Sequence, residues 1–326
     1  MRFASLPNGH PDGRLHLVSR DNRRAVPAWS AATLQAALDQ WDILAPALES
    51  EYDALNRGSV DGERPFDPHA ALAPLPRAWQ WLDGSAFNSH AELMEKAFGF
   101  KAAHPEGKPL MYQGISDRFL SPSEPVPFRF EEDDIDFEGE FGVICDAVPH
   151  GATLAECRSH IRLLVQINDW SLRRLGPSEL KTGFGVIQCK PRCSMAPVAV
   201  TPDEIGPFWR DARIDLPLEI TLNGAAFGRA RGHAMEFGFD QLVEHAAYSR
   251  DLVAGTVIGS GTVSNREWRE VGSSCLTERR MIEVIDHGAP QTGFMRFGDR
   301  LVMEARNDDG SPLFGAIDQT VVQLPA

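Results

Sequence analysis

The sequence predicts an α+β protein that is rich in β-strands. From about Ala78 onward, short apolar segments are separated by tight-turn signals, of which Asn223-Gly224 is the clearest. The chain has no internal repeat and no regular alternation of strands with helices, which a doubly wound parallel sheet would require. These observations favour a mixed, strand-rich fold over a doubly wound one.

The chain is expected to divide into a small N-terminal domain, residues 1–75, and a larger domain, residues 76–326. Alternating apolar residues before the turn signal Asp21-Asn22 predict a hairpin at the start. Ser30 is expected to cap the helix that follows. A stretch rich in Gly, Pro and Asp, residues 57–76, then reads as the join between the two domains.

The larger domain is predicted to contain several short strands and few helices. Alternation predicts a strand within residues 135–148, and a continuous apolar run predicts a fully buried strand over residues 161–167. The remaining expected elements are strands at 216–222 and 255–258, a short helix capped by Asp240, and a final hairpin that pairs 300–305 with 313–321.

Composition excludes several classes of partner. The 326 residues carry 32 Lys and Arg against 46 Asp and Glu, a formal charge of −14, whereas phosphate backbones and anionic membranes attract clustered cations. No apolar run is long enough to span a membrane, and the N-terminus lacks the apolar stretch of a signal peptide. The five cysteines are scattered and odd in number, which is typical of reduced thiols, so we expect a cytoplasmic protein.

The most informative stretch holds two acids separated by one glycine, Glu138-Gly139-Glu140. On a strand, such residues share a face, with Cα atoms about 6.5–7 Å apart. Two carboxylates on one face repel unless a positive charge lies between them, and oxygen ligands suit Mg²⁺, Ca²⁺ or Mn²⁺. The alternative is an edge strand whose acids face water.

Three further segments gain meaning beside this acidic pair. Asp169 directly follows the apolar run, where an acid must be paired, bound to metal or used as a cap. Lys190 could steady an anionic substrate or a developing enolate, although it could equally be a surface lysine. The turn Gly259-Ser260-Gly261-Thr262 follows a predicted strand and could offer backbone N–H groups to an anion, or be a plain turn.

Other catalytic motifs are missing from the sequence. The glycine-containing segments at 183–185 and 259–261 do not match the dinucleotide-binding fingerprint. Cys189 and Cys193 lack a second Cys/His pair at zinc spacing. There is no Gly-x-Ser-x-Gly motif of a serine hydrolase.

Taken in order, the motifs resemble those of the fumarylacetoacetate hydrolase family. The resemblance rests on Asp-Phe-Glu-Gly-Glu-Phe-Gly-Val-Ile (136–144), Val-Gln-Ile-Asn-Asp-Trp-Ser-Leu-Arg (165–173), Lys190 and the glycine–threonine segment 255–264. It covers roughly residues 80–322, and several motifs in the same order are more specific than any one of them. The N-terminal region matches only by position.

The resemblance implies a mixed β-sandwich or roll, a homodimer and a divalent metal held by the acidic pair and an aspartate. Carried across residue by residue, Glu138, Glu140 and Asp169 are the expected ligands, with Mg²⁺ the first choice and Ca²⁺ or Mn²⁺ as alternatives. Some members add an earlier aspartate, for which Asp117 is the candidate. Some also carry a histidine seven residues after that aspartate, but Glu124 stands seven residues after Asp117.

The resemblance also implies the groups that act on the substrate. Arg173 resembles a contact for the substrate carboxylate, Lys190 the active-site lysine, and Thr262 with the adjacent Gly261 a substrate contact. Family members need a base to activate water, and the expected base is His90. Its partner glutamate is expected to be either Glu92 or Glu278, because Leu93 stands three residues after His90, where one family motif has a glutamate.

The implied activity is hydrolysis of a carbon–carbon bond in a small anionic β-diketo acid, such as fumarylacetoacetate or an acylpyruvate, within the breakdown of aromatic compounds. One alternative is decarboxylation, keto–enol isomerisation or hydration of a 2-oxo acid with the same metal. Another is a metal-binding scaffold that has lost its activity.

Overall fold

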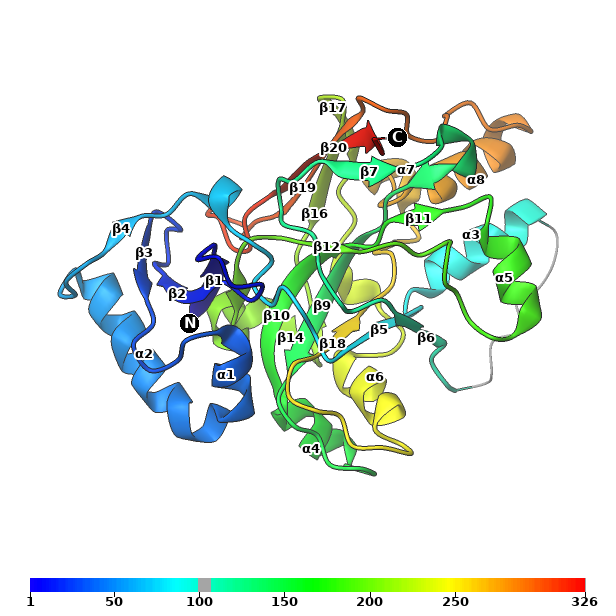
Figure 1. Cartoon of the computed structure of the whole chain (residues 1–326). Helices are drawn as coiled ribbons and strands as arrows, with labels where there is room; N and C mark the ends of the chain where they lie inside the picture. Colours follow the sequence, from blue (N-terminus) through cyan, green and yellow to red (C-terminus); the bar gives the residue numbers. More distant parts are fainter. Residues whose placement is uncertain (99–106, 326) are drawn as a thin grey trace.

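An eleven-stranded sheet runs from the N-terminal part of the protein into the larger part (Figure 1). The computed structural model describes residues 1–98 and 107–325. The sheet continues across the expected domain join because β1 pairs with β13. In spatial order, its strands are β4 (Arg64–Pro65), β3 (Arg24–Pro27), β2 (Arg14–Val18), β1 (Arg2–Leu6), β13 (Ala199–Val200), β10 (Ile161–Asn168), β9 (Gly139–Cys145), β18 (Thr256–Gly259), β5 (Gln80–Gly84) and β6 (Met111–Gly114), with β12 (Ser194–Met195) beside β10.

A second sheet of five strands faces the central part of the first. Its order is β17 (Ala225–Gly228), β16 (Leu218–Leu222), β19 (Arg300–Ala305), β20 (Ile317–Gln323) and β7 (Val126–Phe128). Two small ribbons complete the strands: β8 (Ile135–Asp136) with β11 (Ser171–Leu172), and β14 (Trp209–Arg210) with β15 (Arg213–Ile214).

Most of the helices are short, and they lie around the sheets (Figure 1). They are α1 (Leu34–Asp39), α2 (Trp41–Arg57), α3 (Asn88–Phe98), α4 (Leu154–Ser159), α5 (Gly176–Thr182), α6 (Phe239–Ala246), α7 (Trp268–Val271) and α8 (Leu276–His287). Four 3₁₀ turns span Pro68–Ala70, Glu131–Asp133, Pro202–Phe208 and Gly232–Ala234. Among the described residues, no helix is both long enough and apolar enough to cross a membrane.

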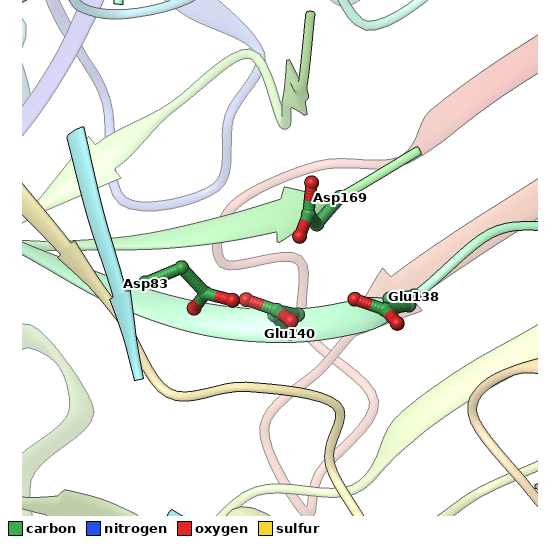
Figure 2. Close-up of side chains that lie close together, drawn as sticks. All are labelled: Asp83, Glu138, Glu140 and Asp169. Atoms are coloured by element: carbon green, nitrogen blue, oxygen red, sulfur yellow. The ribbon is translucent and has the colours of Figure 1, made fainter. Parts of the chain in front are cut away.

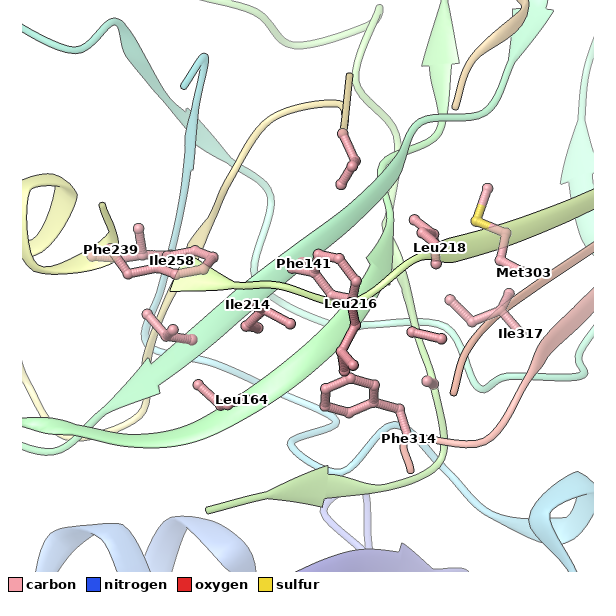
Figure 3. Packing of buried hydrophobic residues seen from close by; sticks show 14 of the residues in the cluster. Phe141, Leu164, Ile214, Leu216, Leu218, Phe239, Ile258, Met303, Phe314 and Ile317 are labelled. Carbon is pink, nitrogen blue, oxygen red and sulfur yellow. The ribbon is translucent and has the colours of Figure 1, made fainter. Parts of the chain in front are cut away.

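The main core fills the space between the two sheets (Figure 3). Phe141 of β9 packs against Phe314, which precedes β20, with ring centroids 6.2 Å apart. Leu218 and Met303 bring side chains of the second sheet into the same cluster. This packing of two sheets over one apolar core is the strand-rich α+β fold that the sequence predicts.

A second core joins the N-terminal part to the opposite face of the central strands. Phe3, Leu17 and other N-terminal side chains pack in one cluster with Ile144 of β9 and Leu163 of β10. Strands β9 and β10 are therefore buried on both faces, which explains why residues 161–167 read as a continuous apolar run.

Most predicted elements are present, and two helix caps differ from expectation. The N-terminal hairpin, the hairpin around Asn223-Gly224 and the pairing of β19 with β20 are confirmed. Thr33, rather than Ser30, caps α1, because its side chain accepts the N–H of Ala36. Asp240 lies inside the first turn of α6, where it pairs with Arg158 at 2.6 Å, and Gly238 is the N-cap.

Candidate metal centre and active site

Four buried carboxyl groups meet beside the central strands. They belong to Asp83, Glu138, Glu140 and Asp169, and one oxygen from each lies within 4.8 Å of the others. Figure 2 shows the four groups turned toward one another. We refer to these four residues as the carboxylate cluster.

Three members of the cluster come from paired segments of chain. Glu138 precedes β9 and Glu140 lies within it, while Asp169 follows β10, the antiparallel neighbour of β9. The N–H of Asp169 donates to the carbonyl of Glu138 at 3.0 Å. Gly139 separates the two glutamates. A side chain at this position would clash, because its Cβ atom would lie 2.8 Å from Leu218 and Ile220 of the second sheet. The glycine thus lets the strand approach the core while its neighbours hold their acids together.

The fourth member, Asp83, was not among the predicted ligands. It lies on β5, which pairs in parallel with β18 and thereby joins the sheet that carries Glu140. The N–H of Gly261, in the turn after β18, donates to Asp83 at 3.1 Å. A sequence signal for Asp83 exists, because it stands seven residues before His90, the aspartate–histidine spacing of some family members that Asp117 lacks.

The structure corrects the prediction for Asp117. Its side chain is 50% exposed and pairs with Arg192 at 2.6 Å, outside the carboxylate cluster. This ion pair holds the pKa of Asp117 below its usual range. Asp83 occupies the place in the cluster that was expected for an early aspartate.

Two cations partly neutralise the cluster. The ammonium group of Lys190 lies 2.6 Å from both Glu138 and Asp169, and it also donates to Ser171 at 2.8 Å. Arg173 lies 2.6 Å from Glu138. The guanidinium of Arg173 also donates to Asp136 at 2.8 Å, so it is bound to protein carboxylates rather than directed to open space.

Burial and mutual repulsion set the protonation of the cluster. Burial, followed by the charge of Asp169, raises the pKa of Asp83 to about 8. Burial and the neighbouring acids also raise the pKa of Glu140 far above its ordinary value. Burial alone would raise the pKa of Glu138, but Lys190 and Arg173 outweigh it and hold that pKa low. Asp169 has a raised pKa because burial outweighs the attraction of Lys190.

The donor set fits a divalent cation. Four carboxylates face the two cations Lys190 and Arg173, and Arg173 is shared with Asp136, so at least two negative charges are left to be balanced by protons or by a divalent ion. Neither carboxyl oxygen of Glu140 has a hydrogen-bond partner among the described residues, although both are buried. Buried carboxylates without donors are costly unless an ion binds them, and an all-oxygen set suits Mg²⁺, Mn²⁺ or Ca²⁺.

Two side chains that were not predicted hold Asp169 in place. Tyr112 of β6 donates its hydroxyl to one oxygen at 2.7 Å, and the thiol of Cys193 donates to the other at 3.1 Å. The ring of Tyr112 also lies 5.4 Å from the ammonium of Lys190. Neither residue has a motif in the sequence that marks it, since both reach Asp169 through sheet pairing.

His90 and Glu278 face each other at the junction of two helices. His90 lies in the first turn of α3 and Glu278 in the first turn of α8, with 3.7 Å between Nδ1 and Oε1. Glu278 is 1% exposed and His90 21% exposed. Glu92 points elsewhere and pairs with Arg266 at 2.6 Å, which corrects the alternative that Glu92 is the partner of His90. Residues two apart on a helix point in different directions, so the two side chains cannot share a face.

The glycine turn lies against the carboxylate cluster. Gly261 adopts a φ of +76°, and a Cβ atom there would meet the carbonyl oxygen of Gly84 at 2.4 Å. Two residues further on, the N–H of Val263 donates to the carbonyl of Gly139 at 2.9 Å. Thr262 between them is buried. The N–H of Gly261 is thus used by Asp83, not held open for an anion as the sequence suggests.

Comparisons with solved structures find the same fold in several enzymes. Maleylpyruvate hydrolase from Sphingobium sp. SYK-6, solved with manganese(II) and pyruvate, is 15% identical, with a TM-score of 0.67 and full coverage of both chains. A probable 2-hydroxyhepta-2,4-diene-1,7-dioate isomerase from Mycobacterium abscessus is 16% identical, with a TM-score of 0.68 over 100% of this chain and 99% of that one. Fumarylpyruvate hydrolase from Pseudomonas aeruginosa, solved with Mn²⁺ and pyruvate, is 13% identical, with a TM-score of 0.56 over 77% and 92% of the two chains.

Family models match nearly the whole chain. The model described as fumarylacetoacetate hydrolase C-terminal matches residues 80–322, and the model described as fumarylacetoacetase N-terminal domain 2 matches residues 1–77. A search of curated protein sequences finds no match. The matched ranges carry the motifs that the sequence presents in order and the carboxylate cluster that the fold assembles from them. The chain belongs to the fumarylacetoacetate hydrolase family.

Proposed function

We propose that the protein is a metal-dependent hydrolase that cleaves a carbon–carbon bond in a β-diketo acid of the acylpyruvate or fumarylacetoacetate type. The observation that carries the proposal is the carboxylate cluster, buried and only partly neutralised, in a chain that also pairs His90 with Glu278. Similar folds in two acylpyruvate hydrolases solved with manganese and pyruvate support it. Such reactions belong to the breakdown of aromatic compounds.

Asp83, Glu138, Glu140 and Asp169 would hold the cation, with Mg²⁺ as the first choice and Mn²⁺ or Ca²⁺ as alternatives. When bound, a divalent ion polarises carbonyl oxygens of the substrate as a Lewis acid and fixes their orientation. A bound divalent ion would balance negative charge that Lys190 and Arg173 leave on the carboxylate cluster, so the site of this acidic protein would no longer repel a small anionic substrate.

The chain's own residues would supply the proton transfers. His90 accepts a proton from water, whose oxygen adds to the distal carbonyl carbon, and Glu278 stabilises the imidazolium that forms. The carbon–carbon bond breaks, and its electron pair passes to the α-carbon, which finally takes a proton. Lys190 would stabilise the negative charge that develops on the leaving enolate, and Thr262 would orient the substrate.

The test is an assay of the purified, chelator-treated protein on acylpyruvates and fumarylacetoacetate, with and without added Mg²⁺ or Mn²⁺. We expect metal-dependent loss of the diketone and formation of two acids. Glu138→Gln and His90→Asn should each lower kcat by roughly 10²–10⁴-fold. The exposed His245→Asn on α6 is the matched control and should have wild-type activity. Full activity of either site variant would contradict the assigned roles.

Keto–enol isomerisation or decarboxylation of a 2-oxo acid is the second candidate. It is favoured by the similar fold of the isomerase from M. abscessus. Neither reaction needs an attacking water. Release of CO₂ from oxaloacetate, or proton exchange at the α-carbon without cleavage of any diketone, would favour this candidate.

A metal-binding scaffold without activity is the third candidate. It requires that the protein binds the metal but turns over none of these substrates. The four proposed ligands form one cluster and the proposed base faces its partner glutamate, which makes this candidate the weakest of the three.

We propose further that the protein works as a homodimer in the cytoplasm. All five cysteines are buried as free thiols, which suits a reducing compartment. Light scattering coupled to size-exclusion chromatography measures the assembly, and a mass of about 36 kDa rather than twice that value would contradict the dimer.

A further inference from the structure

Two buried serines link the helix of His90 to the carboxylate of Glu278. Ser89, next to His90 on α3, donates its hydroxyl to the hydroxyl of Ser264 at 2.8 Å. Ser264, two residues beyond Thr262 in the glycine–threonine segment, donates to Oε1 of Glu278 at 2.5 Å. Both serines and Glu278 are almost completely buried.

The direction of these hydrogen bonds follows from the chemistry of the groups. An ionised carboxylate only accepts, so Ser264 must give its single proton to Glu278. The hydroxyl of Ser264 is then left with acceptor capacity alone, so the proton between the two serines must come from Ser89. When Glu278 is ionised, the chain of donors therefore runs from Ser89 through Ser264 and ends on its carboxylate.

The same oxygen of Glu278 faces His90. The distance from His90 Nδ1 is 3.7 Å, and Nδ1 is buried without a hydrogen-bond partner among the described residues. Catalytic hydrogen bonds are often long in a free enzyme and tighten when substrate binds. A carboxylate that is already held by a donor stays in place while the imidazole approaches it, so less conformational freedom is lost in that step.

We infer that Ser89 and Ser264, here called the serine pair, are positioning residues that fix the carboxylate of Glu278 opposite His90. The inference rests on the proposed function for the His90–Glu278 pair and adds residues that the pair requires. Ser89 also ties the start of α3 to Ser264, whose neighbour Val263 donates its N–H to the carbonyl of Gly139 between the two glutamates of the cluster.

The charged groups around His90 define what a change at Ser264 would alter. Glu278 faces His90 from α8, and Glu138 acts on it from the segment before β9. On α3 itself, Glu92 is neutralised by Arg266. Ser264→Ala leaves these charges unchanged and removes only the donor to Glu278, so a shift in protonation can be assigned to that donor.

The experiment compares Ser264→Ala, Ser89→Ala, Glu278→Gln and the double variant Ser264→Ala/Glu278→Gln with wild type, all loaded with Mg²⁺. Without the hydroxyl of Ser264, the carboxylate of Glu278 attracts a proton more strongly, so protonated His90 opposite it is stabilised. We therefore expect Ser264→Ala to move the acid limb of kcat/KM, and the ring-proton NMR titration of His90, upward by about one pH unit. Its kcat should fall about tenfold. Ser89→Ala should shift both in the same direction by less, and Ser264→Thr, which keeps a hydroxyl, should restore most of the activity.

Ser5→Ala is the matched control for loss of a buried, hydrogen-bonded serine. Ser5 donates to the carbonyl of Pro74 in the N-terminal part, so its loss should lower Tm and leave the pH profile unchanged. The inference is overturned if the His90 titration in Ser264→Ala matches that in wild type. It is also overturned if the loss of kcat in the double variant equals the full combined losses of Ser264→Ala and Glu278→Gln. Failure of the proposed function gives a different result. In that case His90→Asn would retain full activity, whereas the NMR titration of His90 in Ser264→Ala would still test the role of the serine pair.

Discussion

Single residues decide whether the carboxylate cluster can hold a cation, and Glu140 is the clearest case. Its carboxyl group is buried with no hydrogen-bond partner among the described residues, and its pKa is raised by burial and by the neighbouring acids. A group in this state gains more from a bound cation than one that already has donors. The protein thus carries an acid that is costly to bury without an ion.

We expect Glu140→Gln to weaken Mn²⁺ binding by at least about 10²-fold, because it removes a charged oxygen ligand from the centre of the cluster. Isothermal titration calorimetry on chelator-treated protein measures the affinity. Asp117→Asn is the matched control, since Asp117 is exposed and paired with Arg192, and it should bind Mn²⁺ like wild type. A weaker affinity in the control than in Glu140→Gln would reverse our assignment of the two residues.

At the scale of elements, the site depends on turns and loops that bring distant strands together. Gly261 combines a positive φ with a close approach to the backbone of Gly84 at the end of β5, the strand of Asp83. This turn places its N–H on Asp83, so the conformation of one glycine determines how β18 meets the fourth carboxylate.

Gly261→Ala should destabilise the protein by about 2–4 kcal/mol, the sum of a left-handed alanine and a clash with rigid backbone. Gly224→Ala separates the two contributions, because Gly224 has a φ of +78° but open space around its Cα. We expect about 1 kcal/mol for Gly224→Ala. Urea denaturation monitored by circular dichroism measures both, and equal losses would show that the close approach to Gly84 is relaxed at no cost.

The loop before Lys190 is held by a single carboxylate on α5. Glu179 accepts the N–H groups of Ile187 at 3.2 Å, Gln188 at 2.9 Å and Cys189 at 3.0 Å. The hydrogen bond from Gln188 is the largest contribution to a pKa of about 2 for Glu179. The carboxylate therefore remains ionised at any pH at which the enzyme is expected to work, and it positions the residue that precedes Lys190.

Glu179→Gln should lower kcat between about three- and tenfold, because a neutral amide binds three N–H groups less well and the loop that carries Lys190 loosens. Glu156→Gln on α4 is the control, since Glu156 likewise accepts a backbone N–H but lies in an exposed capping box outside the cluster. Steady-state kinetics with saturating metal distinguish the two variants. Unchanged kcat in Glu179→Gln would remove Glu179 from the positioning of Lys190.

For the whole molecule, the cluster links folding stability to pH and metal. The pKa of Asp83 is about 8 in the folded, metal-free protein and that of Glu140 is also raised, whereas both acids ionise near pH 4 once unfolded. The unfolded chain therefore binds fewer protons than the folded chain between these values, so stability falls as pH rises through this window.

We expect the Tm of chelator-treated protein to decrease from pH 5.5 to pH 8, and added Mn²⁺ or Mg²⁺ to raise Tm most at the upper end of this range. A bound cation replaces the protons that the cluster otherwise requires. Differential scanning fluorimetry at constant ionic strength measures the effect. A metal-induced rise in Tm that is the same at pH 5.5 and pH 8 would contradict this linkage.

The two parts of the chain are also linked at this scale. The sheet continues from β1 to β13, and the second core contains side chains from both parts. The division at residues 75 and 76 stays a prediction, although the two family models meet between residues 77 and 80. Sequence patterns show a change of composition there, but they do not show that one sheet crosses it.

The sequence by itself determined the fold class, the order of most strands and three of the four cluster residues. Glu138, Glu140 and Asp169 lie in or beside one antiparallel pair of strands, within the two motifs that resemble those of the family, and that resemblance identified them as the expected ligands. Only the tertiary structure decided the rest. Asp83 joins the cluster through the parallel pairing of β5 with β18, and Glu278 reaches His90 through the packing of α8 against α3. Such contacts join segments more than 150 residues apart, and no local periodicity encodes which of them will meet.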